Sequence, residues 1–360
     1  MHFYMPTKVY QENDCVKNHA AELTALGTRA MVITGRHSAK ANGSFGDVAA
    51  VLDDAHLPFV LFDEIEENPS VESVMKARDL AVSEGCDLFI GIGGGSPMDA
   101  AKAISLMAYH KDQDASYLYA ADTDDTAYPI VAVPTTCGTG SEVTAISVLT
   151  IHEQQTKKGL PHKLFPVLSL VDPKYLMAAP VPVLHSTAMD ALCHLAESYV
   201  NSKATDYSRM CADAGLRAWK RSKSLLKKER KLETLDEAEA LMVASSLAGM
   251  AIAHTGTSLP HGLSYGLTYT LGTPHGKACG RFLPGYLAAA SVEDRSHVLE
   301  LAGFHDLKEL KEFLAESCGC EDIPDDLRQH IVEQLAPNTE RLKVAPFPVD
   351  PSVLYQIIDF

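Results

Sequence analysis

The sequence has no uninterrupted apolar stretch of roughly 18 residues, the length that a membrane-spanning helix needs. It also has no secretory signal pattern, because Met1 to Pro6 leads directly into a strand-like segment. An excess of positive charge is missing too: the formal net charge of −16 argues against nonspecific binding to DNA or to anionic membranes. We find no internal repeat and no low-complexity tract. These absences predict a cytoplasmic globular protein without a nucleic-acid or membrane partner.

The spacing of cysteines that is typical of a disulfide framework is also absent, since the eight cysteines are scattered along the chain. In a reducing compartment such cysteines are expected to be free thiols. The cysteines are Cys15, Cys86, Cys137, Cys193, Cys211, Cys279, Cys318 and Cys320.

Length and patterning predict two domains, since 360 residues with 46% hydrophobic and 22% charged residues can form two cores. Up to residue 173, strand-like runs alternate with helical stretches such as Val71 to Ser83, which is typical of a parallel sheet wrapped by helices. The strand-like runs lie near 30–34, 58–62, 88–92 and 130–133. After residue 173, helical patterns dominate, at 186–201, 206–220, 236–253, 291–303 and 307–318. We therefore predict a Rossmann-like α/β domain over 1–173 and an all-α domain over 174–360.

Two glycine-containing turns follow predicted strands of the first domain. The run Asp87 to Ile92 breaks into Gly93-Gly94-Gly95-Ser96, and a helix starts near Asp99. Such a junction directs free N–H groups and the positive end of a helix at one spot, which favours phosphate. The stretch is not the ordinary dinucleotide fingerprint, because Ser96 stands where its third glycine would be. The second turn, Pro134 to Glu142, adds three threonines and two glycines. Either turn alone could be a tight strand–helix connection; together they favour phosphate binding.

Four side chains of the second domain predict a metal site. Asp190 and His194 lie one helical turn apart, in a helix that Ser186 or Thr187 can cap. His261 and His275 are each preceded by proline and followed by glycine, and we expect His275 on the loop after a helix that carries His261. One carboxylate and three imidazoles suit Fe²⁺ or Zn²⁺ better than Ca²⁺ or Mg²⁺. The alternative is a hydrogen-bonded Asp and His without metal.

These motifs resemble the iron-containing (group III) alcohol dehydrogenase family. The resemblance rests on residues 93–102 and 134–144 and on the Asp190, His194, His261 and His275 series, and it extends from about Phe3 to Pro284. It implies a dehydroquinate synthase-like fold, metal-assisted hydride transfer on a small primary alcohol, diol or aldehyde, and a homodimer. It also implies Fe²⁺, with Zn²⁺ possible, at the four metal positions. The coenzyme positions that it implies are Gly94, Gly95 and Ser96 at the pyrophosphate, Asp99 near the nicotinamide, and Thr135, Thr136 and Thr139 on the adenosine side.

One departure from the family concerns the proton relay. Many relatives carry a further histidine four residues after the third metal ligand, and here that position is Tyr265. Tyr265 faces the same way as His261 and can donate through its hydroxyl. At an ordinary pKa near 10, a tyrosine relays protons less readily at neutral pH than an imidazole. His254 is an alternative relay, or else a surface or capping residue.

A second departure concerns the coenzyme. NAD-preferring relatives have an acidic residue where this sequence has Gly35, and an acid there would repel a 2′-phosphate. Arg36, Ser38 and Lys40 follow and offer contacts for such a phosphate, so we expect NADP(H) to be preferred over NAD(H). The alternative is that these are ordinary solvated residues of a strand–helix loop.

Three other functions compete with this one. A zinc-dependent glycerol dehydrogenase-like polyol oxidoreductase is nearest in chemistry. A dehydroquinate synthase-like lyase would need a cluster of Lys and Arg around the metal, and Lys277 alone is close to His275. A catalytically silent nucleotide- or metal-binding module would leave the filled ligand positions unexplained. We expect the active site in the cleft between the two domains, a common location for pockets.

Overall fold

The computed structural model describes the chain except for residues 1, 155, 228–229 and 320–321. Its contacts divide the chain into two compact units. One contains Met5–Thr136 and Ser141–Ala179, and the other contains Met1–Tyr4, Cys137–Gly140 and Pro180–Phe360. The boundary between the two units at Ala179 and Pro180 lies a few residues after residue 173, the boundary expected from the sequence. The expected free thiol of Cys320 lies outside the described residues; the other seven cysteines are unpaired.

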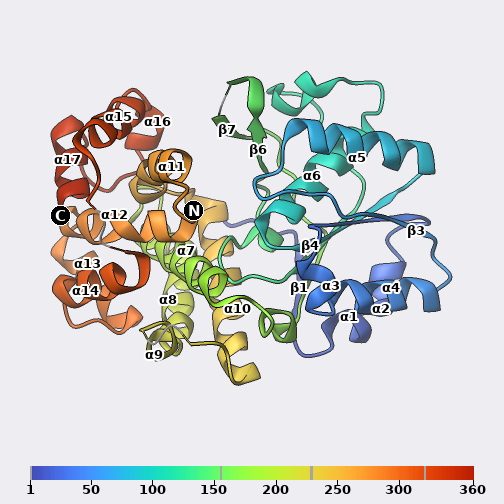
Figure 1. Cartoon of the computed structure of the whole chain (residues 1–360), viewed down its shortest axis with the longest axis horizontal. Coiled ribbons are helices and arrows are strands. Elements are labelled where there is room, and N and C mark those ends of the chain that lie inside the picture. The colour runs from blue at the N-terminus through green and yellow to red at the C-terminus, as the bar shows by residue number, and fades with distance from the viewer. Residues whose placement is uncertain (1, 155, 228–229, 320–321) are drawn as a thin grey trace. The chain divides into compact units, whose positions relative to one another are not determined.

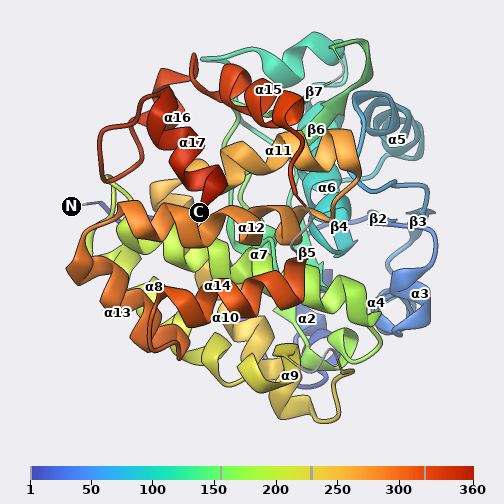
Figure 2. The ribbon, with the colours of Figure 1, turned by 60° about the vertical axis from the view of Figure 1, so that its left-hand side comes forward.

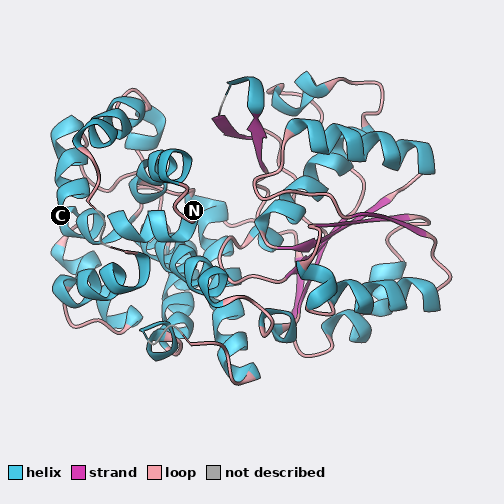
Figure 3. Ribbon diagram, in the orientation of Figure 1, coloured by secondary structure: helices cyan, strands magenta, loops and turns pink. Residues whose placement is uncertain are grey.

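The first unit contains a six-stranded parallel sheet with the strand order β1-β8-β5-β4-β2-β3. Figure 3 draws the strands in magenta. The strands are β1 (Lys8–Gln11), β2 (Ala30–Thr34), β3 (Phe59–Phe62), β4 (Leu88–Gly93), β5 (Ile130–Pro134) and β8 (Leu168–Val171). The four predicted strand-like runs correspond to β2, β3, β4 and β5. The sequence analysis missed β8, and it also missed an antiparallel pair of strands, β6 (Val148–Ile151) and β7 (Thr156–Gly159).

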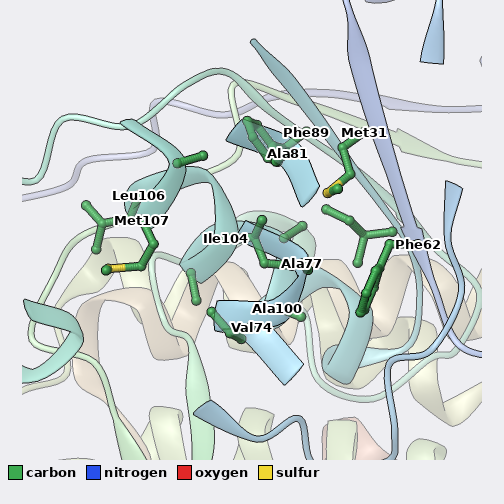
Figure 4. Packing of buried hydrophobic residues seen from close by; sticks show 14 of the residues in the cluster. Met31, Phe62, Val74, Ala77, Ala81, Phe89, Ala100, Ile104, Leu106 and Met107 are labelled. Carbon is green, nitrogen blue, oxygen red and sulfur yellow. The ribbon is translucent and has the colours of Figure 1, made fainter. Parts of the chain in front are cut away.

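Helices cover both faces of this sheet because its central strands are buried on both sides (Figure 1). Successive side chains of a strand point to opposite faces. Met31 and Phe89 therefore pack with α5 and α6, in the core that Figure 4 shows, whereas Val32 and Ile90 pack on the other face with α1, α2 and α4. These helices are α1 (Cys15–Asn18), α2 (Ala20–Thr24), α3 (Ser38–Ala41), α4 (Ser44–Asp54), α5 (Val71–Glu84) and α6 (Gly95–Tyr109). Single-turn 3₁₀ segments lie at Ala115–Tyr119, Ser141–Val143, His152–Gln154 and Pro173–Leu176. The fold class expected from the sequence is confirmed.

The second unit is helical. Figure 2 shows α7 and α12 lying side by side, and α7 also packs against α8 and α10. The helices are α7 (Val181–Val200), α8 (Asp206–Lys220), α9 (Lys223–Lys227), α10 (Leu235–Thr255), α11 (Leu259–Leu271), α12 (His275–Ala289), α13 (Val292–Ala302), α14 (Leu307–Cys318), α15 (Asp325–Leu335), α16 (Thr339–Leu342) and α17 (Pro351–Asp359).

Two local expectations for the second unit are wrong. His275 does not lie on a loop: Pro274 occupies the N-cap position, and His275 is the first residue of α12. Similarly, α7 begins at Val181, after Pro180, rather than at a Ser186 or Thr187 cap. In both cases a proline stands at the N-cap, where its missing N–H removes no hydrogen bond of the helix, and the helix starts at the next residue.

Within the described residues, no single helix is long and apolar enough to cross a membrane. Only α10 and α11 taken together pass the test of length and composition, and they are bent by 109° at the break between them.

Candidate metal centre and coenzyme loops

One face of α7 supplies three buried polar side chains. Asp190, His194 and Glu197 are 3%, 5% and 0% exposed, respectively. Positions i, i+4 and i+7 share one helix face, which explains why they come together. The Nδ1 atom of His194 lies 3.1 Å from the carbonyl oxygen of Gly138, to which an N–H can donate. This leaves its Nε2 atom 3.8 Å from Oδ1 of Asp190.

Glu197 orients the first histidine of α11. The Nδ1 atom of His261 lies 2.6 Å from Oε1 of Glu197, and the backbone N–H of Ser258 donates to Oε2 of the same carboxylate. When His261 is neutral with its proton on Nδ1, its Nε2 atom carries a lone pair, and this atom lies 3.3 Å from Oδ1 of Asp190. A carboxylate that holds the far nitrogen of an imidazole is typical of metal-ligating histidines.

The start of α12 brings His275 to the same place, with its Nε2 atom 3.8 Å from Oδ1 of Asp190. The next residue, Gly276, packs so tightly against α7 that a Cβ atom there would lie 1.8 Å from the carbonyl oxygen of Ser186. Glycine at this position therefore lets α12 approach α7 closely enough to place His275. The ring of Tyr265 stacks on His275 with 6.2 Å between centroids, and its side chain is exposed.

His254 makes a different set of contacts. Its Nδ1 atom lies 2.7 Å from the carbonyl oxygen of Met250, and its Nε2 atom accepts from the backbone N–H of Tyr4. Its ring also stacks on Phe3. None of these contacts is with the Asp190 cluster, so Tyr265 is the candidate relay residue that the structure brings next to one of the predicted ligands, His275.

The cluster fits a metal ion. Oδ1 of Asp190 and Nε2 of His261 are buried and have no hydrogen-bond partner among the described residues. A buried polar atom without a partner is costly, and a bound cation would remove the cost for both atoms at once. The ligand atoms of Asp190, His261, His275 and Cys279 all lie within 4.8 Å of one another.

The buried groups of the cluster shift one another's pKa values. Burial raises the pKa of the Asp190 carboxyl, but His194, His261 and His275 outweigh it and hold this pKa below its ordinary value. Burial lowers the pKa of His194 to about 4, so this imidazole is neutral at pH 7, as a ligand must be. For Cys279, burial raises the pKa, but His261 and His275 outweigh it and lower the pKa to about 7.

The glycine triplet opens α6 in the first unit. α6 begins at Gly95 with Gly94 as N-cap, and no side chain caps its first N–H groups. A Cβ atom on Gly94 would lie 3.1 Å from Oγ1 of Thr136, so the two predicted loops approach each other closely here. Thr135 is buried and donates its N–H to the carbonyl oxygen of Gly93. Uncapped N–H groups beside a glycine backbone form a site that suits phosphate.

Asp99 holds this region together. Its Oδ1 atom accepts from the Ser141 hydroxyl at 2.6 Å, and its Oδ2 atom accepts from the backbone N–H of Val148 at 2.9 Å. Burial raises the pKa of Asp99, although the nearby Lys102 ammonium opposes the shift. The carboxylate at the predicted nicotinamide position therefore already has structural partners.

Thr139, the third threonine predicted for the adenosine side, belongs to the second unit and is partly buried.

The residues predicted to choose the coenzyme lie after β2. Arg36 lines a surface pocket of about 560 Å³ together with Glu64, Glu66, Glu72 and Lys76. Lys40 pairs with Asp63 at 2.5 Å. Gly35 has room for a side chain, since its Cβ would meet the carbonyl oxygen of Ile65 at 3.4 Å, an ordinary contact distance.

Two further residues predicted to bind the coenzyme, Ser38 and Ser96, lie a few positions after β2 and β4. Ser38 is the first residue of α3, and the Ser96 hydroxyl accepts from the backbone N–H of Asn68 at 3.1 Å.

Comparison with known proteins places this chain in a family. The family model for iron-containing alcohol dehydrogenases matches residues 6–173, and the model for the C-terminal part of that family matches residues 185–331. A 1,3-propanediol dehydrogenase of Citrobacter freundii is 31% identical over 283 residues, which span 77% of this chain and 72% of that protein. The chain belongs to the iron-containing alcohol dehydrogenase family.

Other members of the iron-containing alcohol dehydrogenase family agree. An NAD-dependent methanol dehydrogenase of Bacillus methanolicus is 29% identical over 305 residues, spanning 84% of this chain and 80% of that protein. The crystal structure of an iron-containing alcohol dehydrogenase of Thermotoga maritima superposes with a TM-score of 0.90 at 36% identity, covering 99% of this chain and 98% of that chain. This chain is therefore an oxidoreductase of a metal-binding alcohol dehydrogenase family.

Two residues of the cluster around Asp190 were missed by the sequence analysis. Glu197 follows His194 by three positions on one helix, and Cys279 follows His275 by four, so both spacings indicate a shared helix face. The spacing was available in the sequence, but the partner of each side chain depends on how α7, α11 and α12 pack.

Proposed function

We propose that the protein is a metal-dependent alcohol dehydrogenase or aldehyde reductase that transfers a hydride between NADP(H) and a small primary alcohol, diol or aldehyde. The observation that carries the proposal is the pair of buried, unpartnered atoms Oδ1 of Asp190 and Nε2 of His261, 3.3 Å apart. Groups of this kind in a dehydrogenase family with a metal cofactor are best explained as ligands.

Asp190, His194, His261 and His275 would hold Fe²⁺, with Zn²⁺ as the other candidate. When bound, the ion supplies Lewis acidity, which lowers the pKa of an alcohol or polarises a carbonyl. Glu197 and the carbonyl of Gly138 fix the far nitrogens of His261 and His194, so that both rings keep one orientation. Tyr265, beside His275, would pass a proton between the substrate oxygen and solvent through its exposed hydroxyl.

For the coenzyme, the N-terminus of α6 and the backbone of Gly94 and Gly95 would bind the pyrophosphate. The preference for NADP(H) is supported by Gly35, which places no acid directly after β2, and by the cation of Arg36 at the next position. Lys40 would have to exchange Asp63 for a 2′-phosphate. Ser38 offers a hydroxyl at the first turn of α3.

The test is coenzyme oxidation by metal-stripped protein with a panel of short aldehydes, with Fe²⁺ (anaerobically) or Zn²⁺ added and with NADPH and NADH compared. We expect turnover to return with metal and kcat/KM to favour NADPH. In Gly35→Asp, the ratio of kcat/KM for NADPH to that for NADH should fall tenfold or more, about 1.4 kcal/mol, because the carboxylate repels the 2′-phosphate.

The matched control is Gly46→Asp, which adds the same charge at a glycine of α4 with no atom within 4 Å of its Cβ position. It should leave the coenzyme ratio unchanged. A wild-type ratio near unity, or one that favours NADH, would contradict the NADP(H) assignment, and turnover without metal would contradict the role of the ion.

We also infer a homodimer in which the amino-terminal segment, Phe3 to Tyr10, pairs across subunits. The support is that β1 lies at one end of the strand order and pairs with β8 alone among the described strands. An open strand edge is a template for pairing with another chain. Deletion of residues 1–10 should lower the solution mass measured by light scattering, and an unchanged mass would count against this interface.

A further inference from the structure

A thiol lies among the side chains of the proposed metal site. Cys279 is fully buried on α12, one helical turn after His275. Its Sγ atom lies 3.7 Å from Nε2 and 3.9 Å from Nδ1 of the His275 ring. The i, i+4 spacing that joins Asp190 and His194 on α7 therefore recurs on α12, with sulfur as the second donor.

Three of the distances between these donor atoms match those around one ion. A tetrahedral zinc with Zn–N of about 2.0–2.1 Å and Zn–S of about 2.3 Å keeps its ligand atoms roughly 3.3–3.8 Å apart. Here Nε2 of His261 lies 3.3 Å from Oδ1 of Asp190, Nε2 of His275 lies 3.8 Å from the same oxygen, and Sγ of Cys279 lies 3.7 Å from Nε2 of His275. The four donor atoms all lie within 4.8 Å of one another.

The thiol is not the only indication of a ligand at this place. The unpartnered, buried oxygen of Asp190 and nitrogen of His261 belong to the same four-atom group. In addition, Glu197 occupies the opposite nitrogen of His261, which leaves Nε2 for the interior of the group.

We propose that the Cys279 thiolate is a further ligand of the ion held by Asp190, His194, His261 and His275. This inference rests on the proposed metal site, and it adds a sulfur donor to a set otherwise made of nitrogen and oxygen. On binding, the S–H bond breaks, a metal–sulfur bond forms and the proton leaves to the buffer, with no change of oxidation state. Thiolate favours zinc over harder ions, so Cys279 shifts the selectivity of this chain toward Zn²⁺.

X-ray absorption of the zinc-loaded wild-type protein tests this without any variant. We expect a Zn–S shell at about 2.3 Å beside the N/O shell at about 2.0–2.1 Å. Cobalt-loaded protein should likewise show a sulfur-to-metal charge-transfer band in the near ultraviolet. Cys279→Ser should lose both signatures, and its zinc-to-iron ratio after loading with an equimolar mixture should fall.

Cys211→Ser is the matched control, because it also removes a buried, unpaired thiol, on α8. It should keep the sulfur shell. An N/O shell alone in fully zinc-loaded wild type would overturn the role of Cys279 and leave the metal site intact. Absence of any bound ion in the wild type would overturn both. If Cys279→Ser fails to fold, the wild-type spectrum still decides.

Discussion

Replacing Asp190 by asparagine is expected to lower metal affinity by more than about 100-fold and to abolish turnover, while the fold is retained. Losing an outer partner of a metal ligand already costs about 10–100-fold, and Asp190 is itself a proposed ligand, whose Oδ1 atom lies 3.3–3.8 Å from Nε2 of His194, His261 and His275. The asparagine side chain has the same shape, so the packing of α7 is preserved. Metal content by mass spectrometry and aldehyde reduction with NADPH measure the effect.

The matched control for Asp190→Asn is Asp213→Asn. Asp213 on α8 also pairs with a histidine, since its Oδ1 atom lies 3.0 Å from Nε2 of His297, but this pair is partly exposed and is separate from the cluster. Asp213→Asn should keep full metal content and activity. Stoichiometric metal together with wild-type turnover in Asp190→Asn would show that the cluster is not the catalytic centre.

The fold was predictable where the pattern is strong. The central strands β2, β4 and β5 are buried on both faces and therefore appear in the sequence as continuous apolar runs. The exposed strand β7, Thr156–Gly159, has no such run, and its pairing with β6 comes from long-range contacts. The short strand β8 ends directly before Asp172-Pro173, where the sequence suggested a domain boundary instead.

For the candidate site, the proposed ligands were predictable from the sequence, but the residues around them were not. Helical spacing and the family resemblance pointed to Asp190 and the three histidines, and the structure brings these four side chains together. Spacing did not identify what surrounds them. Glu197 has its role because the start of α11 presents the N–H of Ser258 and the ring of His261 to it, and that contact joins residues about sixty positions apart. Rules based on local sequence spacing cannot predict a contact between residues so far apart in the chain.

Glu197→Gln is expected to weaken metal binding by about 10–100-fold without removing any proposed ligand. In the wild type, both carboxylate oxygens accept hydrogen bonds, from Nδ1–H of His261 and from the N–H of Ser258. An amide has one acceptor oxygen, so one of these donors must face the NH₂ group. The His261 ring then loses its fixed tautomer and orientation. Isothermal titration of metal-stripped protein with zinc measures the loss.

A purely structural role of Glu197 would give a different result, and Asp172→Asn provides the comparison. Asp172 is also fully buried, and its two oxygens accept from the backbone N–H groups of Cys15 and Lys174. Either substitution should lower the free energy of unfolding of the metal-free protein by about 1.5–3 kcal/mol, the range for hydrogen bonds to charged groups. Only Glu197→Gln should also lower zinc affinity, and excess metal should restore its turnover. If Glu197→Gln binds zinc as tightly as Asp172→Asn does, Glu197 supports the fold alone and does not position His261 for the ion.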